Sequence, residues 1–214
     1  MPLRLLLVRH GLSSFNKERR IQGRDDLSNL SEEGHGQARA LGHSLQDVNI
    51  QAIYSSPLQR AAATTASLLE TQGGQTPDPV FDDGLLEVDL EPWSGQTIVE
   101  LMQGSTEAYK IWKERPMELE LQRRDGSSYK PLPELMEQAQ DFISKLLERH
   151  PANGNDTVLV VAHNAILRCL MLVLLGEPDH GFRRLRVDNT SLSVFNIRPG
   201  AVSYTHLTLP TIRL

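Results

Sequence analysis

Two histidines and two arginines follow three short apolar runs of the sequence. Arg9 and His10 come directly after the first run, and His163 directly follows a later one. Arg60 lies just after Ser-Ser-Pro at the end of another run, one turn into the next expected helix. Planar guanidinium groups pair bidentately with phosphate oxygens, and an imidazole can attack phosphorus or donate to an oxygen. These residue types predict a pocket for a phosphoryl group.

The same residues make a poor metal site. Two arginine cations would repel a divalent ion, and neither a His-Glu-x-x-His motif nor a pair of carboxylates accompanies the histidines. The sequence also has no Walker-type phosphate loop. We therefore expect no metal and no cofactor.

The elements that must position these residues alternate along the chain. Short apolar runs predict buried strands at 3–8, 52–54, 157–162 and 191–197. Periodic apolar residues predict helices at 31–46, 58–69, 97–113, 133–149 and 165–175. This alternation is typical of an α/β fold, here a three-layer α/β/α sandwich with a mostly parallel central sheet.

The carboxyl ends of parallel strands meet at one edge of a sheet, where ligands bind. Arg9, His10, Arg60 and His163 all follow strands, so they should meet at this edge. The helix after His163 should direct its free amides and its dipole toward the same anion. We expect the segment 87–133 to cover this edge.

Composition limits the partners. The 22 Lys and Arg against 27 Asp and Glu give a net charge of −5, so we expect no nucleic acid and no membrane as partners. The N-terminal apolar run is too short for a membrane span. Cys169 is the only cysteine, which favours a reducing compartment, and we expect the cytoplasm. The expected partner is a small phosphomonoester; a homodimer stays open.

In this order, the motifs resemble the histidine phosphatase superfamily, also called the phosphoglycerate mutase-like family. The resemblance runs from residue 3 to about 196 and comprises Leu7-Val8-Arg9-His10-Gly11 with Asn16 and Gln22-Gly23, Leu30-Ser31-Glu32-Glu33-Gly34 with Gln37-Ala38, Ser55-Ser56-Pro57-Leu58-Gln59-Arg60-Ala61, Glu87, His163, and Asn189-Thr190-Ser191. It implies one domain over 1–200. After Pro199-Gly200, we expect 201–214 to be a vector-encoded extension without a folded element.

The resemblance also implies a mechanism. His10 would attack phosphorus and form a phosphohistidine, which requires a neutral ring whose other nitrogen donates to a backbone carbonyl. Glu87 would protonate the departing oxygen and then deprotonate the attacking water, with Asp89 and Glu91 as nearby competitors for this role. The transferring oxygens would be bound by Arg9, Arg60, His163 and Asn16. Further substrate contacts are expected from Gln22, Gly23 and Asn164.

Several residues have a plainer interpretation. The remaining histidines, which lie outside the motifs, are expected to be structural or solvated: His35, His43, His150, His180 and His206. Packing roles are expected for Trp93, Trp112 and Cys169. Arg123 and Arg124 are expected on a solvated face, with binding of a substrate carboxylate as the alternative.

The sequence departs from the family pattern at Leu12, where a polar residue commonly lines the pocket, and at Asn164, where Gly or Ser is common. These departures bear on the substrate more than on the reaction.

The expected function is hydrolysis of a small phosphomonoester without metal, with phosphoserine as the leading substrate. One alternative is a phosphoglycerate mutase. Mutases of the family carry Arg-His-Tyr-Gly after the glutamate, whereas this chain reads Val88-Asp89-Leu90-Glu91. The second alternative is a phospho-ligand-binding protein that has lost the chemistry.

Overall fold

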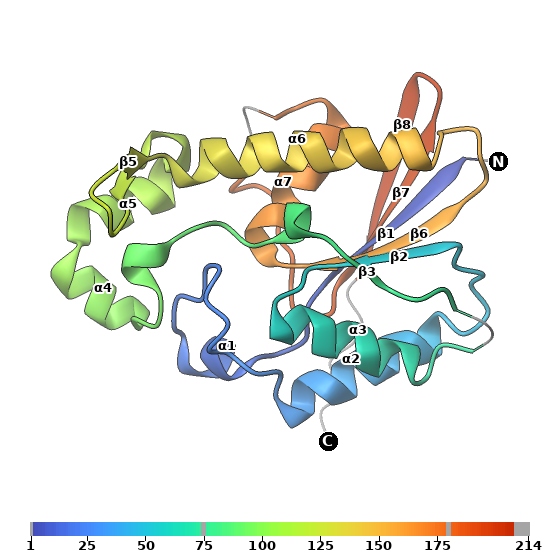
Figure 1. Ribbon diagram of the computed structural model, residues 1–214, viewed down its shortest axis with the longest axis horizontal. Coiled ribbons are helices and arrows are strands. Elements are labelled where there is room, and N and C mark those ends of the chain that lie inside the picture. Colours follow the sequence, from blue (N-terminus) through green and yellow to red (C-terminus); the bar gives the residue numbers. More distant parts are fainter. Residues whose placement is uncertain (1, 74–75, 179–180, 208–214) are drawn as a thin grey trace.

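Figure 1 shows the computed structural model, which describes residues 2–73, 76–178 and 181–207. The central sheet has six strands in the order β3-β2-β6-β1-β7-β8. Their bounds are Leu3–Arg9 for β1, Ala52–Ser55 for β2, Val80–Phe81 for β3, Thr157–Ala162 for β6, Leu192–Arg198 for β7 and Ala201–Leu207 for β8. Three strand pairs are parallel and two are antiparallel, so the expected mostly parallel sheet is confirmed.

Helices cover both faces of the sheet, as expected for a three-layer sandwich (Figure 1). The helices α2 (Glu32–Ser44) and α3 (Gln59–Leu69) lie on one face. The helices α6 (Pro131–Arg149) and α7 (Asn164–Leu175) lie on the other. In β1, Leu6 and Val8 belong to the apolar cluster of α2 and α3, whereas Leu5 and Leu7 belong to that of α6 and α7. This burial on both faces explains why the strand is a continuous apolar run.

The helix boundaries follow local chemistry. Ser31 caps α2 by accepting a hydrogen bond from the amide of Gly34. Gly176 ends α7 with a φ of 74°. The helix α6 begins at Pro131, two residues before the predicted start, since proline costs no hydrogen bond in a first helical turn.

The segment before α6 lies beyond the carboxyl ends of the strands (Figure 1). The helical stretch predicted near 97–113 is confirmed, but it forms two helices, α4 (Ile98–Gly104) and α5 (Thr106–Glu114), separated at Ser105. Gly104 and Ser105 are weak helix formers, which explains the break. The polar stretch that follows carries a small hairpin of β4 (Leu121–Gln122) and β5 (Ser128–Tyr129).

Short elements complete the chain. They are α1 (Ser14–Glu18) and the 3-10 helices η1 (Asp83–Leu85), η2 (Glu91–Trp93) and η3 (Pro116–Glu118). None of the helices in the described parts of the chain is long and apolar enough to cross a membrane.

The expectation that the C-terminal segment carries no folded element is wrong for residues 201–207. They form β8, which pairs antiparallel with β7 at the edge of the sheet. The Pro199-Gly200 break is the hairpin turn, with a φ of 74° at Gly200. The ring of Tyr204 lies 4.6 Å from that of Phe195, centroid to centroid. The rest of the predicted tail, 208–214, lies outside the described residues.

Candidate active site

His10 follows the last residue of β1 and is 2% exposed. Its amide donates to the carbonyl of Ala162 at 2.9 Å, and Asn189 donates to the carbonyl of His10 at 2.9 Å. The next amide, that of Gly11, donates to Thr64 Oγ1 at 3.0 Å. Groups from β6, α3 and the residues before β7 therefore fix the backbone that carries the imidazole.

The ring of His10 is oriented for attack through Nε2. Its Nδ1 lies 2.8 Å from the carbonyl oxygen of Gly11. Since a carbonyl can only accept, Nδ1 carries the proton and Nε2 keeps its lone pair, in agreement with the expectation for this ring. Burial, and then the charges of Arg9 and Arg60, hold the pKa of His10 well below its usual range. The imidazole is therefore neutral.

Two guanidinium groups accompany the imidazole, one on the buried Arg60 and one on the partly buried Arg9. Arg9 donates to the carbonyl of Val187 at 2.8 Å. Arg60, 1% exposed, donates to the carbonyls of Gly23 and Asp25 at 2.8 and 3.0 Å. Burial lowers the pKa of Arg9 to about 10 and also lowers that of Arg60. Each keeps a buried Nε that has no hydrogen-bond partner among the described residues, so both have donor capacity for an anion.

His163 immediately precedes α7 and lies against His10, with ring centroids 5.2 Å apart. Its Nε2 is 2.7 Å from Ser56 Oγ, and its buried Nδ1 has no hydrogen-bond partner in the part of the chain that the structure describes. It is fully buried and does not line the pocket described below. The structure therefore places His163 behind the nucleophile.

Glu87 lies at the N-terminus of α7. Its carboxylate accepts hydrogen bonds from the amides of Ala165 at 3.0 Å and Ile166 at 3.2 Å, and from that of Val88 at 2.9 Å. The expectation that the amides of this helix bind the substrate anion is therefore wrong for these two, because they hold Glu87. They fix the carboxylate at the pocket wall.

A cavity of about 180 Å³ brings these groups together. Eight of the nine predicted site residues line it, and His163 is the exception. Of the three candidates for the proton-transferring acid, which are Glu87, Asp89 and Glu91, only Glu87 lines the cavity. Asp89 accepts from the amide of Glu91, and Glu91 pairs with Arg124 at 2.8 Å.

The first loop contributes Asn16, Gln22 and Gly23 to the pocket. Asn16 Oδ1 accepts from Asn189 Nδ2 at 3.2 Å and from the hydroxyl of Ser13 at 3.0 Å. In the described parts of the chain, Asn16 Nδ2 has no partner, so it is free to donate to a ligand. Asn164, the first residue of α7, keeps a buried Oδ1 without a partner.

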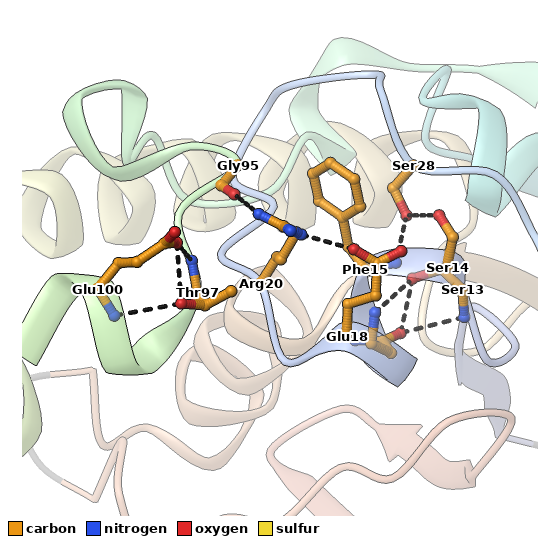
Figure 2. A network of polar contacts seen from close by, with 10 residues as sticks. Ser13, Ser14, Phe15, Glu18, Arg20, Ser28, Gly95, Thr97 and Glu100 are labelled. Atoms are coloured by element: carbon orange, nitrogen blue, oxygen red, sulfur yellow. Dashed lines mark hydrogen bonds and ion pairs between the residues drawn. The ribbon is translucent and has the colours of Figure 1, made fainter.

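Figure 2 shows how this loop is tied to the covering segment. Arg20 donates to the carbonyl of Gly95 at 2.8 Å and pairs with Glu18 at 2.6 Å, while its amide donates to the carbonyl of Phe15 at 2.9 Å. Beside it, Thr97 and Glu100 form the capping box that begins α4. Arg20 also lines the pocket, so this network shapes its wall.

Sequence reasoning missed three arginines of the pocket: Arg20, Arg168 and Arg183. Arg168 could have been found from its position one turn after Asn164 on α7, whereas Arg20 and Arg183 carry no such signal. Ser56 belongs to a quoted motif, but its contact with His163 was not predicted.

Other residues lie outside the pocket. Arg123 stacks on Tyr129 and pairs with Glu134, and neither it nor Arg124 lines the cavity. Leu12 does not line it either, so the idea that Leu12 changes the pocket wall is wrong.

The histidines outside the motifs fit structural roles where they are described. His35 hydrogen-bonds Ser67, and His150 hydrogen-bonds Tyr54 and Asp156. His43 is exposed. His180 and the side chain of His206 lie outside what the structure describes.

Two packing predictions have different outcomes. Cys169 is fully buried in α7, and burial raises the pKa of its thiol, in agreement with a packing role. Trp112 is largely buried but also lines the pocket.

Fold and site together define an α/β protein with a buried, neutral histidine between two arginines at the carboxyl edge of its sheet. The chain belongs to the histidine phosphatase superfamily (branch 1), whose family model matches residues 5–209. Among solved structures, Bacillus stearothermophilus YhfR matches with a TM-score of 0.83 and 27% identity, over 95% of this chain and 96% of that one.

Three curated relatives show the range of names in the family. Phosphoserine phosphatase 1 of Hydrogenobacter thermophilus is 33% identical, over 91% of this chain and 87% of the relative. A probable 2-carboxy-D-arabinitol-1-phosphatase of Arabidopsis thaliana is 34% identical, over 92% of this chain and 39% of the relative. A probable phosphoglycerate mutase GpmB of Salmonella arizonae is 34% identical, over 89% of this chain and 83% of the relative.

Proposed function

We propose that this protein hydrolyses a small phosphomonoester through a phosphohistidine on His10, without a metal ion. The observation that carries the proposal is the hydrogen bond between His10 Nδ1 and the carbonyl of Gly11, which leaves Nε2 as the nucleophile in a pocket with two arginines. The pocket also holds Glu87, the carboxylate placed for proton transfer.

In the first step, Nε2 of His10 forms a bond to phosphorus as the bond from phosphorus to the ester oxygen breaks. Glu87 gives its proton to the departing oxygen, which leaves as an alcohol. In the second step, Glu87 takes a proton from water, the oxygen attacks phosphorus, and the phosphorus–nitrogen bond breaks. Inorganic phosphate is released, and His10 and Glu87 return to their starting states.

Arg9 and Arg60 bind the phosphoryl oxygens throughout. Both are held by backbone carbonyls before any ligand arrives, so they need little reorganisation during the reaction. Donors fixed in this way are typically worth about 3 kcal/mol each at a transition state in a water-poor site. Asn16 would add a further donor through its Nδ2.

Phosphoserine is the leading substrate. Phosphoserine and 2-carboxy-D-arabinitol 1-phosphate, the compounds in two of the relatives' names, each carry a carboxylate close to the phosphate ester. Their shared chemistry supports a small phosphomonoester with a carboxylate as the substrate of this chain.

The mutase alternative requires transfer of the phosphoryl group to a second hydroxyl rather than to water. Immediately after Glu87, the residues that line the pocket are Val88 and Leu90. Both are apolar and offer no contact to a second phosphate, which favours hydrolysis. An inactive binding protein is disfavoured because the nucleophile, both arginines and the carboxylate lie around one cavity.

Turnover of p-nitrophenyl phosphate and phosphoserine in the presence of a chelator tests the mechanism. We expect activity in chelator, and acid-labile, base-stable phosphate bound to the protein after rapid quenching. His10→Ala should lose both, while His43→Ala, which changes an exposed histidine, should lose neither. Absence of turnover by the wild type, a requirement for added metal, or activity in His10→Ala would overturn the proposal.

The substrate is tested with a panel of phosphoserine, 3-phosphoglycerate, sugar phosphates and phosphotyrosine, ranked by kcat/KM. We expect phosphoserine to rank first. Formation of a phosphoglycerate isomer instead of inorganic phosphate would favour the mutase.

A further inference from the structure

The pocket contains a second pair of arginines, distinct from Arg9 and Arg60. Arg168 comes from α7, and Arg183 from the chain that follows it; both line the cavity. Both contact Phe182, with the guanidinium carbon of Arg168 5.4 Å and that of Arg183 5.3 Å from its ring centroid. Arg183 also lies 4.8 Å from the ring centroid of Trp112. Aromatic faces thus hold both cations at the cavity.

Among the described residues, these two arginines have no carboxylate partner, unlike several arginines on the surface of the protein. In the described parts of the chain, Arg168 makes no hydrogen bond and no ion pair, and its Nε is buried without a partner. Arg183 donates to the carbonyl of Trp112 and has no carboxylate within ion-pair distance in those parts. By contrast, Arg123 and Arg124 pair with Glu134 and Glu91.

Burial of an unpaired cation is unfavourable unless an anion compensates it. Arg168 is partly buried, and this burial lowers the pKa of its guanidinium group, whereas Arg183 is an exposed residue whose pKa partial desolvation lowers to about 10. The largest acidic influence on the pKa of Arg168 is that of Glu87, whose carboxylate already accepts hydrogen bonds from the amides of Ala165 and Ile166. A ligand anion would therefore complete this part of the pocket.

We propose that Arg168 and Arg183 bind the carboxylate of the substrate while Arg9 and Arg60 bind its phosphate. This inference rests on the proposed function, since it assigns specificity within the same pocket. A guanidinium group presents a planar fork of donors that matches a carboxylate, and both forks lie close to the ring of Phe182 at the cavity. The pair would make a carboxylated phosphomonoester a better substrate than the same ester without the carboxylate.

The test compares substrates that differ in the carboxylate. One pair is phosphoserine and phosphoethanolamine, and the other is 3-phosphoglycerate and glycerol 1-phosphate. For Arg168→Met, we expect kcat/KM to fall about 10- to 100-fold for the carboxylated member, mainly through KM. For the uncarboxylated member and for p-nitrophenyl phosphate, it should change less than about threefold. Arg183→Met should act in the same direction.

Arg123→Met is the matched control, because Arg123 also stacks on an aromatic ring but lies outside the pocket. This substitution should leave kcat/KM unchanged for all four substrates of the two pairs. Arg168→Lys keeps the charge without the planar fork and should recover part of the lost discrimination. Such partial rescue would not be expected if Arg168 only filled space.

Three outcomes would overturn the assignment. If Arg168→Met lowered kcat/KM equally for carboxylated and uncarboxylated esters, Arg168 would act through Glu87. No preference of the wild type for the carboxylated members would mean that no carboxylate is bound. Dependence on Arg168 for a bisphosphate without a carboxylate would mean that the pair binds a second phosphate.

A calorimetric arm separates this inference from the proposed function. His10→Ala, with and without Arg168→Met, is titrated with phosphoserine and with phosphoethanolamine. Tighter binding of phosphoserine that disappears in the double variant supports the carboxylate subsite even if the wild type shows no turnover. Equal affinities for the two ligands overturn the subsite even if the enzyme is active.

Discussion

The ring of His163 lies against that of His10, with centroids 5.2 Å apart and planes inclined by 56°. Both rings are buried, and burial together with Arg9 and Arg60 holds both pKa values well below the usual range. Two neutral imidazoles can pack together without repulsion. This contact provides a neutral wall behind the nucleophile, and it makes folding sensitive to acid.

The first prediction concerns that sensitivity. As the pH falls below about 6.5, the unfolded chain takes up protons at His10 and His163 while the folded state does not. The free energy of unfolding should therefore decrease on acidification, by up to about 1.4 kcal/mol per pH unit for each of the two histidines. Urea unfolding of the wild type and His163→Gln between pH 5 and 7 measures this slope.

The free energy of unfolding of His163→Gln should depend less steeply on pH than that of the wild type, because the variant has lost one of the two buried histidines. His43→Gln should keep the wild-type slope, since that side chain is exposed. Identical slopes for the wild type and His163→Gln would show that His163 is protonated in the folded state.

The second prediction concerns the hydroxyl that holds His163. Ser56→Ala removes the 2.7 Å contact with Nε2 and leaves the ring without its described partner. We expect kcat to fall about tenfold, as for loss of about 1.4 kcal/mol, with little change in KM. Ser55→Ala is the neighbouring control, because Ser55 hydrogen-bonds Thr65 and the carbonyl of Ser56 instead. Steady-state kinetics in which Ser55→Ala loses as much kcat would refute a specific role for Ser56.

The third prediction separates proton transfer by Glu87 from its contact with the N-terminus of α7. Glu87→Gln keeps an acceptor for the amide of Ala165 but cannot donate or take up the proton. We expect kcat for phosphoserine to fall about 10²- to 10⁴-fold. The loss should be much smaller for the first step with p-nitrophenyl phosphate, whose leaving group needs no proton. Single-turnover phosphorylation of His10 measures that step.

Asp89→Asn serves as the control, because Asp89 does not line the pocket. Its kcat should fall less than about threefold with either phosphoserine or p-nitrophenyl phosphate. If Glu87→Gln lost the same factor with both leaving groups, its role would be to position α7 rather than to transfer a proton.

The fourth prediction concerns packing of α2 on α3. A Cβ at Gly42 would lie 2.1 Å from the carbonyl oxygen of Leu68, so Gly42→Ala must push the helices apart. We expect a loss of about 1–3 kcal/mol in the free energy of unfolding. Gly36→Ala in the same helix meets nothing within 4 Å and should gain up to about 1 kcal/mol. Chemical denaturation of both variants tests the contrast, and destabilisation by Gly36→Ala would contradict it.

Much of this architecture follows from local pattern. The apolar runs at β1 and β6 are readable because both faces of these strands are buried. The break in the predicted helix at Ser105 was missed because helical periodicity continues across it. Strand β8 was missed because most of its described side chains are exposed and its pairing with β7 is a tertiary interaction.

By itself, the sequence determined the class of fold, the order of the motifs and the position of His10 at the end of a strand, because strand ends and short motifs are local properties of the chain. Only the tertiary structure decided that the amides of α7 hold Glu87, that His163 lies behind His10 rather than at the pocket wall, and that Arg168 and Arg183 enter the cavity. The physical reason is that these relationships join segments far apart in sequence. Their geometry depends on how helices pack across the sheet, which no local pattern records.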